Sequence, residues 1–142
     1  MTEVPVMRAV QLVRQRPEMF FEGGRATMSE LISLVSRDVA SFKQFKVQIH
    51  RDGPYAMITS DCDWMVTERA TLEELFDRFV LPSSARPNSH RSEVLLSAVC
   101  EGVLALGMNG NFSSGLEITE VPATMAEIAV SAVRALIWKF EE

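Results

Sequence analysis

The stretch Val13-Arg14-Gln15-Arg16-Pro17-Glu18-Met19-Phe20 is the part of this sequence that most constrains the fold. It follows an amphipathic run from Pro5 to Val13 and stops shortly before Gly23-Gly24. Apolar side chains in that run recur at helical spacing, and a residue that precedes proline avoids the helical region. The sequence therefore predicts a first helix that ends before Pro17 and a turn at the two glycines. We expect Met19 and Phe20 to pack on the core.

Length and charge restrict the class of protein. The 142 residues suit one domain, 1–142, with a single core, and the composition is 47% hydrophobic and 23% charged, as in soluble globular proteins. A net charge of −5 leaves no basic surplus for phosphates, so we expect no nucleic-acid binding. The sequence contains neither an apolar run near the roughly 20 residues that span a bilayer nor a signal-peptide pattern. We therefore expect a cytoplasmic protein without membrane association.

The sequence offers few groups for metal binding or nucleophilic catalysis. Cys62 and Cys100 are far apart and lack CxxC spacing, while His50 and His90 each stand alone. These spacings predict neither a disulfide framework nor a metal site. Because no nucleophile elbow accompanies the histidines, the sequence predicts no catalytic residue and favours a protein that is not an enzyme.

Three capping boxes indicate where helices begin. In each, a threonine precedes by three residues a glutamate whose side chain can reach back to a free backbone N–H. The boxes start at Thr27, Thr71 and Thr124 and predict helices over about 28–44, 72–79 and 122–140, with a loop over 82–90. Residues 92–106 are predicted as a further helix, although Gly102 and the valines also permit a strand.

Alternating apolar residues predict strands. Lys46–His50 and Tyr55–Thr59 flank Asp52-Gly53 and indicate a β-hairpin. Residues 116–121 also alternate, after a glycine-rich loop, and residues 63–66 and 99–106 stay open as further strands. This pattern predicts an α+β fold, a two-layer sandwich of helices on one face of a small mixed or antiparallel sheet. Trp64 and Trp138 are expected to be core or interface anchors.

The order of these features resembles the ATPase domain of gyrase B and its relatives, the GHKL superfamily of gyrase, Hsp90, histidine kinases and MutL. The resemblance covers roughly residues 7–112. It includes the Arg-Pro-x-Met-aromatic string, the glycine turn, the long helix, the strand pair around Asp52-Gly53 and the following Asp61. His90 to Val99 is similar to the family's Glu-Val-x-x-x-x-Leu helix, which precedes a glycine-containing lid. The resemblance implies a gyrase B/Hsp90 ATPase-like fold.

The resemblance also implies which residues would carry ATP hydrolysis. In the family, a Glu on the long helix activates water and an Asn one turn later holds Mg²⁺. Those positions fall on Ser36 and Ala40, or on Val35 and Val39 when Asp38 is aligned with the family's Asp. Neither register supplies a base or a magnesium ligand, so the chain resembles a degenerate member of the superfamily that lacks the catalytic Glu and the magnesium-binding Asn.

The resemblance leaves four candidate nucleotide-binding residues. Asp61 corresponds to the adenine-binding aspartate, although Cys62-Asp63-Trp64 follows it where the family has Gly-Arg-Gly. A Trp64 near adenine would crowd a ligand or fill the pocket itself. The other candidates lie in the loop that corresponds to the lid, which lacks a lysine and the GxxGxG spacing: Gly107, Gly110 and Gly115. ATP therefore stays open as a ligand, and no other cofactor is expected.

These departures predict a non-catalytic protein-interaction or regulatory domain of the inhibitor, adaptor or immunity type, built on a degenerate GHKL-like fold. Two alternatives stay open: a nucleotide-binding protein without efficient hydrolysis, and an unrelated small α+β binding protein. The sequence does not identify the protein partner, but an acidic surface suits a basic one. Val130, Val133 and Ile137 widen the apolar face of the last predicted helix, which permits a homodimer.

Overall fold

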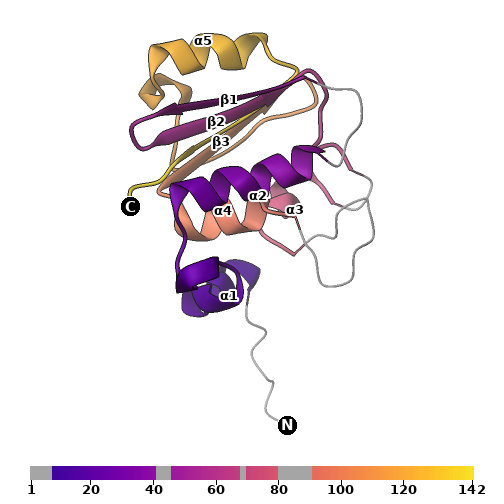
Figure 1. Ribbon diagram of the computed structural model, residues 1–142. Coiled ribbons are helices and arrows are strands. Elements are labelled where there is room, and N and C mark those ends of the chain that lie inside the picture. Colours follow the sequence, from indigo (N-terminus) through magenta and orange to yellow (C-terminus); the bar gives the residue numbers. More distant parts are fainter. Residues whose placement is uncertain (1–7, 41–45, 68–69, 80–90) are drawn as a thin grey trace.

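The computed structural model describes residues 8–40, 46–67, 70–79 and 91–142. In this part of the chain a five-stranded sheet lies between helices on both of its faces (Figure 1). Helix α5 (Ala123–Ser131) covers one face, and α2 (Met28–Ala40) and α4 (Glu93–Val99) cover the other. The predicted α+β class is confirmed. The expectation of helices on one face only is wrong, because apolar side chains point from both faces of the sheet.

The N-terminal segment follows the sequence prediction in part. Helix α1 (Ala9–Gln15) ends before the short 3-10 turn η1 (Pro17–Met19), and a second turn, η2 (Glu22–Gly24), contains Gly23 with φ of 72°. Residues 1–7 lie outside the described part. Phe21 is buried here, 3% exposed, whereas Met19 is 63% exposed. The expectation that Met19 packs on the core is therefore wrong.

The sheet has the strand order β1-β2-β5-β3-β4, and each neighbouring pair is antiparallel. The strands are β1 (Val47–Asp52), β2 (Tyr55–Ser60), β3 (Gly102–Gly107), β4 (Phe112–Ser114) and β5 (Arg134–Lys139). The predicted hairpin is confirmed as β1–β2. The helix predicted over 92–106 is right only as far as α4, since its second half is β3, the strand that the sequence left open.

The helix predicted over 122–140 is wrong beyond Ser131. Residues 134–139 form β5, the central strand, with β2 on one side and β3 on the other. Its run Arg134-Ala135-Leu136-Ile137-Trp138 is buried throughout, and a strand buried on both faces does not alternate. Because Ile137 is buried in the sheet, the helical face invoked for a homodimer does not form. On α5 itself, Val130 is 73% exposed.

Two shorter elements also differ from their predictions, and one strand that the sequence left open does not form. Residues 116–121 contain the 3-10 turn η3 (Ile118–Glu120) instead of a strand, and their buried ends, Leu116 and Val121, pack with the α5 core. Helix α3 (Leu72–Leu75) is shorter than the predicted 72–79. Residues 63–66 form a turn and no strand. The predicted loop 82–90 and the predicted helix end at 41–44 lie outside the described residues.

The three predicted capping boxes have different outcomes. The box at Thr71 is confirmed, with hydrogen bonds of 3.2 and 3.1 Å between Thr71 and Glu74. At Thr27, the hydroxyl accepts from Glu30 N, but the Glu30 carboxylate accepts from Glu22 N. The box at Thr124 is wrong, because α5 already begins at Ala123, after Pro122.

Alternate residues of β2, β3 and β5 divide the core into two clusters. Ile58, Leu136 and Trp138 pack with α2 and α4, whereas Met57 and Ile137 pack with α5. Trp138 and Trp64 are 0% and 1% exposed, so the prediction that both tryptophans are anchors of the core is confirmed. Among the described residues, no helix is long and apolar enough to cross a membrane.

Candidate functional site

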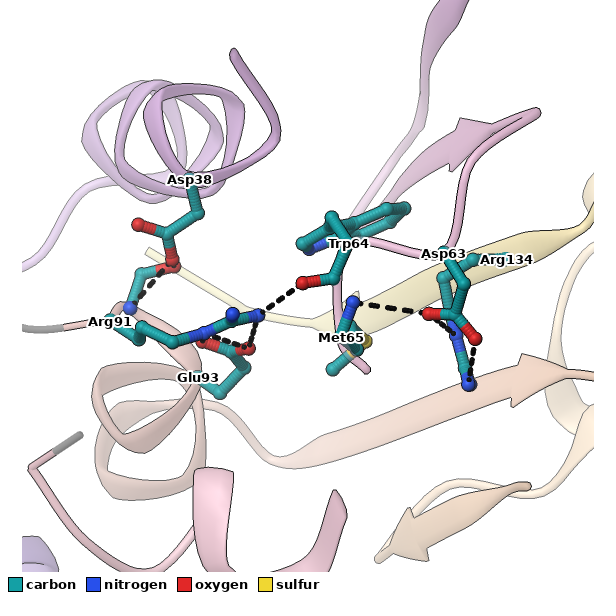
Figure 2. A network of polar contacts seen from close by, with 8 residues as sticks. Asp38, Asp63, Trp64, Met65, Arg91, Glu93 and Arg134 are labelled. Carbon is teal, nitrogen blue, oxygen red and sulfur yellow. Dashed lines mark hydrogen bonds and ion pairs between the residues drawn. The ribbon is translucent and has the colours of Figure 1, made fainter. Parts of the chain in front are cut away.

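The most highly organised polar cluster is buried where the strands meet α2 and α4 (Figure 2). It contains two ion pairs, Arg134–Asp63 and Arg91–Glu93, with N–O distances of 2.8 and 2.6 Å. All four side chains are at most 7% exposed. Charges taken out of water in this way are stable only when each is paired and hydrogen-bonded.

The first ion pair is bidentate. Arg134 Nε donates to Asp63 Oδ1 and Arg134 Nη2 to Asp63 Oδ2, both at 2.8 Å. Burial alone would raise the pKa of Asp63. Hydrogen bonds from Arg134 and from the Asn109 side-chain amide, together with the Arg134 charge, nevertheless hold this pKa below its ordinary value. Asp63 is therefore a fixed carboxylate that is poorly suited to accept a proton in catalysis.

The glycine-rich loop is built around this guanidinium. Arg134 Nη1 donates to the carbonyl of Gly110 at 2.9 Å, and Gly107 is paired with Arg134 across β3 and β5. A Cβ on Gly107 would lie 2.6 Å from Arg134 Cζ. Asn111 Oδ1 accepts from Gly107 N at 3.0 Å and so closes the turn. Among the described residues, the loop thus surrounds a protein cation.

The second ion pair joins α4 to the turn that follows β2. Arg91 Nη2 donates to Glu93 Oε2 at 2.6 Å and to the carbonyl of Trp64 at 2.9 Å. Complete burial, together with the charge of the nearby Asp38 carboxylate, raises the pKa of Glu93, while the Arg91 charge acts in the opposite direction. The guanidinium of Arg91 is also partly desolvated, but the Glu93 charge raises its pKa. The pair therefore holds Arg91 in its charged form.

Asp38 links the long helix α2 to the start of α4. Its Oδ2 accepts from Ser92 N at 2.8 Å and from Ser92 Oγ at 2.6 Å. A carboxylate at this end of α4 satisfies free backbone N–H groups and suits the helix dipole. Asp38, the residue that the resemblance aligned with a family aspartate, therefore holds two helices together.

The turn Asp63-Trp64-Met65 connects the two ion pairs, as Figure 2 shows. Asp63 Oδ1 accepts from Met65 N at 3.0 Å, and the Trp64 carbonyl accepts from Arg91. The Trp64 side chain is 1% exposed and belongs to the core cluster of α2 and α4. Trp64 is therefore part of the core.

The structure brings only some of the predicted nucleotide-binding residues together. Ser60, Arg134 and Gly107 are paired across three strands, so Asp61, Gly107 and Gly110 all lie at one end of the sheet. Gly115 lies at the opposite end of β3, where its Cβ would meet Glu101 O at 2.6 Å. These four residues therefore do not surround a common site.

Asp61 itself is exposed and forms hydrogen bonds with the backbone of Lys46. Its Oδ1 accepts from Lys46 N at 2.7 Å, and its own N–H donates to Lys46 O at 3.3 Å. It borders a hollow of about 260 Å³ between the strand ends and α5. Small-molecule sites usually enclose about 300–1,000 Å³, so this hollow is small for a nucleotide.

The residues aligned with the catalytic Glu and the magnesium-binding Asn belong to helix α2, and in one of the two registers they are core residues. Ser36 Oγ donates to the Ile32 carbonyl at 2.7 Å, and Ala40 is exposed. In the alternative register, Val35 and Val39 are each 1% exposed in the core. The described residues contain no group of three or more His, Cys, Asp or Glu side chains that could hold a metal ion. Cys62 and Cys100 are free cysteines that form no disulfide.

A larger hollow of about 540 Å³ lies between α1, α3, α4 and β4. Two arginines line it: Arg14 Nε donates to Ala98 O at 2.8 Å, and Arg8 is paired with Asp77 at 2.7 Å. Glu73 and Glu74 line the same hollow, so its charges are mixed. Its volume is that of a ligand site, but its lining does not select one class of ligand.

The sequence does not predict the contacts of the polar cluster. Asp63 stands out only as a departure from the Gly-Arg-Gly of the family pattern, and the last predicted helix includes Arg134. One signal was available, because Arg134 is a single charge within an otherwise apolar run, and such a charge is buried only with a partner. The identity of each partner depended on the fold.

No protein-family model matches the chain, and no curated protein or solved structure is significantly similar to it.

Proposed function

We propose that this protein is a non-catalytic protein-interaction or regulatory domain, of the inhibitor, adaptor or immunity type, on a degenerate GHKL-like fold. The proposal rests on one observation: residues in the region of the candidate nucleotide site pack within the protein itself. Trp64 is buried in the core, and in the glycine-rich loop the Gly110 carbonyl accepts a hydrogen bond from Arg134. The Arg134 guanidinium donates all of its nitrogens to Asp63 and Gly110 and is therefore not available to bind phosphate.

The exposed side chains support a role in protein contacts. Several large apolar side chains in the described part are more than a third exposed: Met19, Ile49, Val66, Phe79, Met108 and Val130. Met108 reaches 87% exposure at the tip of the β3–β4 turn. Exposed apolar side chains of this size are available for contacts with another protein. The net charge of −5 favours a basic partner surface.

A thermal-shift titration with ATP and ADP, with and without Mg²⁺, tests the proposal. A ligand that binds only the folded form at 100 times its dissociation constant stabilises that form by about 2.7 kcal/mol. We expect no shift at millimolar nucleotide. A shift that is abolished by Asp61→Asn, and retained by the exposed-site control Glu127→Gln, would favour the nucleotide-binding alternative instead.

A second arm tests for protein contacts directly. Immobilised wild-type protein is compared with the Met108→Glu and Met19→Glu variants, which change exposed side chains on different elements. We expect the immobilised wild type to retain a specific binding partner that one of the two variants no longer retains. Equal capture of the same proteins by all three forms would indicate nonspecific binding and contradict the proposal.

A further inference from the structure

Strand β1 forms an edge of the described sheet, with β2 as its only neighbouring strand. Lys46 O accepts from Asp61 N, which makes Lys46 and Asp61 a hydrogen-bonded pair. In an antiparallel ladder, hydrogen-bonded and non-hydrogen-bonded pairs alternate. The backbone groups of Val47, Ile49 and Arg51 therefore point away from β2, toward the open side of the sheet.

In the described part of the chain, this edge is long and regular. Protected edges are short, bulged, interrupted by proline or lined with charges. Strand β1 has six residues, its register with β2 runs without interruption from Val47 to Asp52, and it contains no proline. Ile49, at its centre, is 51% exposed. The opposite edge, β4, has only three residues. Strand β1 is therefore the edge better suited to accept another strand.

We propose that β1 pairs antiparallel with β1 of a second copy of this chain, forming a homodimer whose sheet is continuous across both copies. With the two-fold axis at Ile49, the two Ile49 residues are opposite each other and Val47 lies opposite Arg51. This register pairs every backbone group of β1 that points outward. Registers centred on neighbouring residues leave some of those groups unpaired.

The charges at the two ends of this edge match in the same register. Lys46 lies opposite Asp52 of the second copy, and the two-fold axis repeats this pair at the other end. Neither side chain has an ion-pair partner within the described part of its own chain. Opposite charges that face each other across strands stabilise the pairing, and like charges destabilise it. The edge is thus complementary to itself, which identifies the occupant as a second copy.

The inference goes beyond the proposed function, because the strand pair requires neither a nucleotide nor another protein. Sedimentation equilibrium of the whole chain over a wide concentration range tests it. We expect a reversible dimer for the wild type. Lys46→Glu places Glu opposite Asp52 at both ends of the interface, so we expect its dimer dissociation constant to rise by about tenfold or more.

A charge exchange separates the interface from effects on folding. Asp52→Lys is expected to weaken the dimer as Lys46→Glu does, and the double variant Lys46→Glu/Asp52→Lys should restore it. Glu127→Lys makes the same change from an acidic to a basic side chain as Asp52→Lys, but at an exposed position of α5. It should leave the dimer intact. A wild type that stays monomeric, single variants that dimerise as the wild type does, or a double variant without restored dimer would each overturn the proposal.

Discussion

Gly107 and Arg134 lie opposite each other in β3 and β5 so closely that any side chain at position 107 would occupy the space of the guanidinium. A Cβ there would be 2.6 Å from Arg134 Cζ. Arg134 cannot move aside freely, because it is buried and its three guanidinium nitrogens donate to Asp63 and Gly110. Packing against Arg134 is therefore a sufficient reason for glycine at position 107.

Gly107→Ala should lower the free energy of unfolding by about 2 kcal/mol, the usual cost of forcing an extra methyl group into a well-packed interior. Urea denaturation followed by circular dichroism measures this change. Ser113→Ala, on the exposed side of the same β-hairpin, serves as the control and should change stability by no more than about 0.5 kcal/mol. Equal stabilities of the two variants would show that the guanidinium has room to move.

The Arg134–Asp63 pair should be strongly coupled. Arg134→Met alone leaves a buried carboxylate without its cation, and Asp63→Leu alone leaves a buried cation, so each should cost about 3–5 kcal/mol. The double variant removes both charges and should lose clearly less than the sum, with a coupling energy up to about 3 kcal/mol. Urea denaturation of the four proteins gives this coupling energy. Additive losses would mean that the two charges do not stabilise each other.

Acid should remove the contribution of Asp63. Its pKa in the folded protein lies below the ordinary value of 3.8, so between those two values the folded protein binds fewer protons than the unfolded chain. The contribution of Asp63 is therefore fully present above the unfolded pKa and is lost as pH falls through the folded pKa. Unfolding free energies of the wild type and Asp63→Asn should differ most near neutral pH and converge below about pH 4. A difference that is independent of pH would contradict this assignment.

The sequence predicted those elements that local chemistry determines. The Asp-Gly turn predicted the β1–β2 hairpin, and the threonine at position 71 predicted the start of α3. Residues 134–139 and 116–121 were predicted wrongly because the deciding interactions lie elsewhere in the chain. Strand β5 is stabilised by its neighbours β2 and β3, and the alternation in 116–121 reflects burial of its two ends beneath α5.

The polar cluster could not be predicted for the same reason. The ion pair between Asp63 and Arg134 joins residues 71 positions apart, and the hydrogen bonds of Asp38 reach Ser92, 54 positions away. The sequence does contain one isolated charge in an apolar run, Arg134, but identifying its partner requires the order of the strands. The resemblance implies a role for Asp61, whereas Asp63, two residues further on, makes the buried contacts.

Trp64 provides the most direct test of whether this region is core or an obstructed ligand site. Its side chain is 1% exposed and packs with α2 and α4, so Trp64→Ala should lower the free energy of unfolding by about 3–5 kcal/mol. Met108→Ala, at an 87% exposed position, is the control and should cost no more than about 0.5 kcal/mol. Chemical denaturation measures both. If Trp64→Ala were as stable as the control and also gained a thermal shift with ATP, Trp64 would be the side chain that closes a nucleotide pocket. A large loss of stability without ATP binding is the result expected when Trp64 is part of the core.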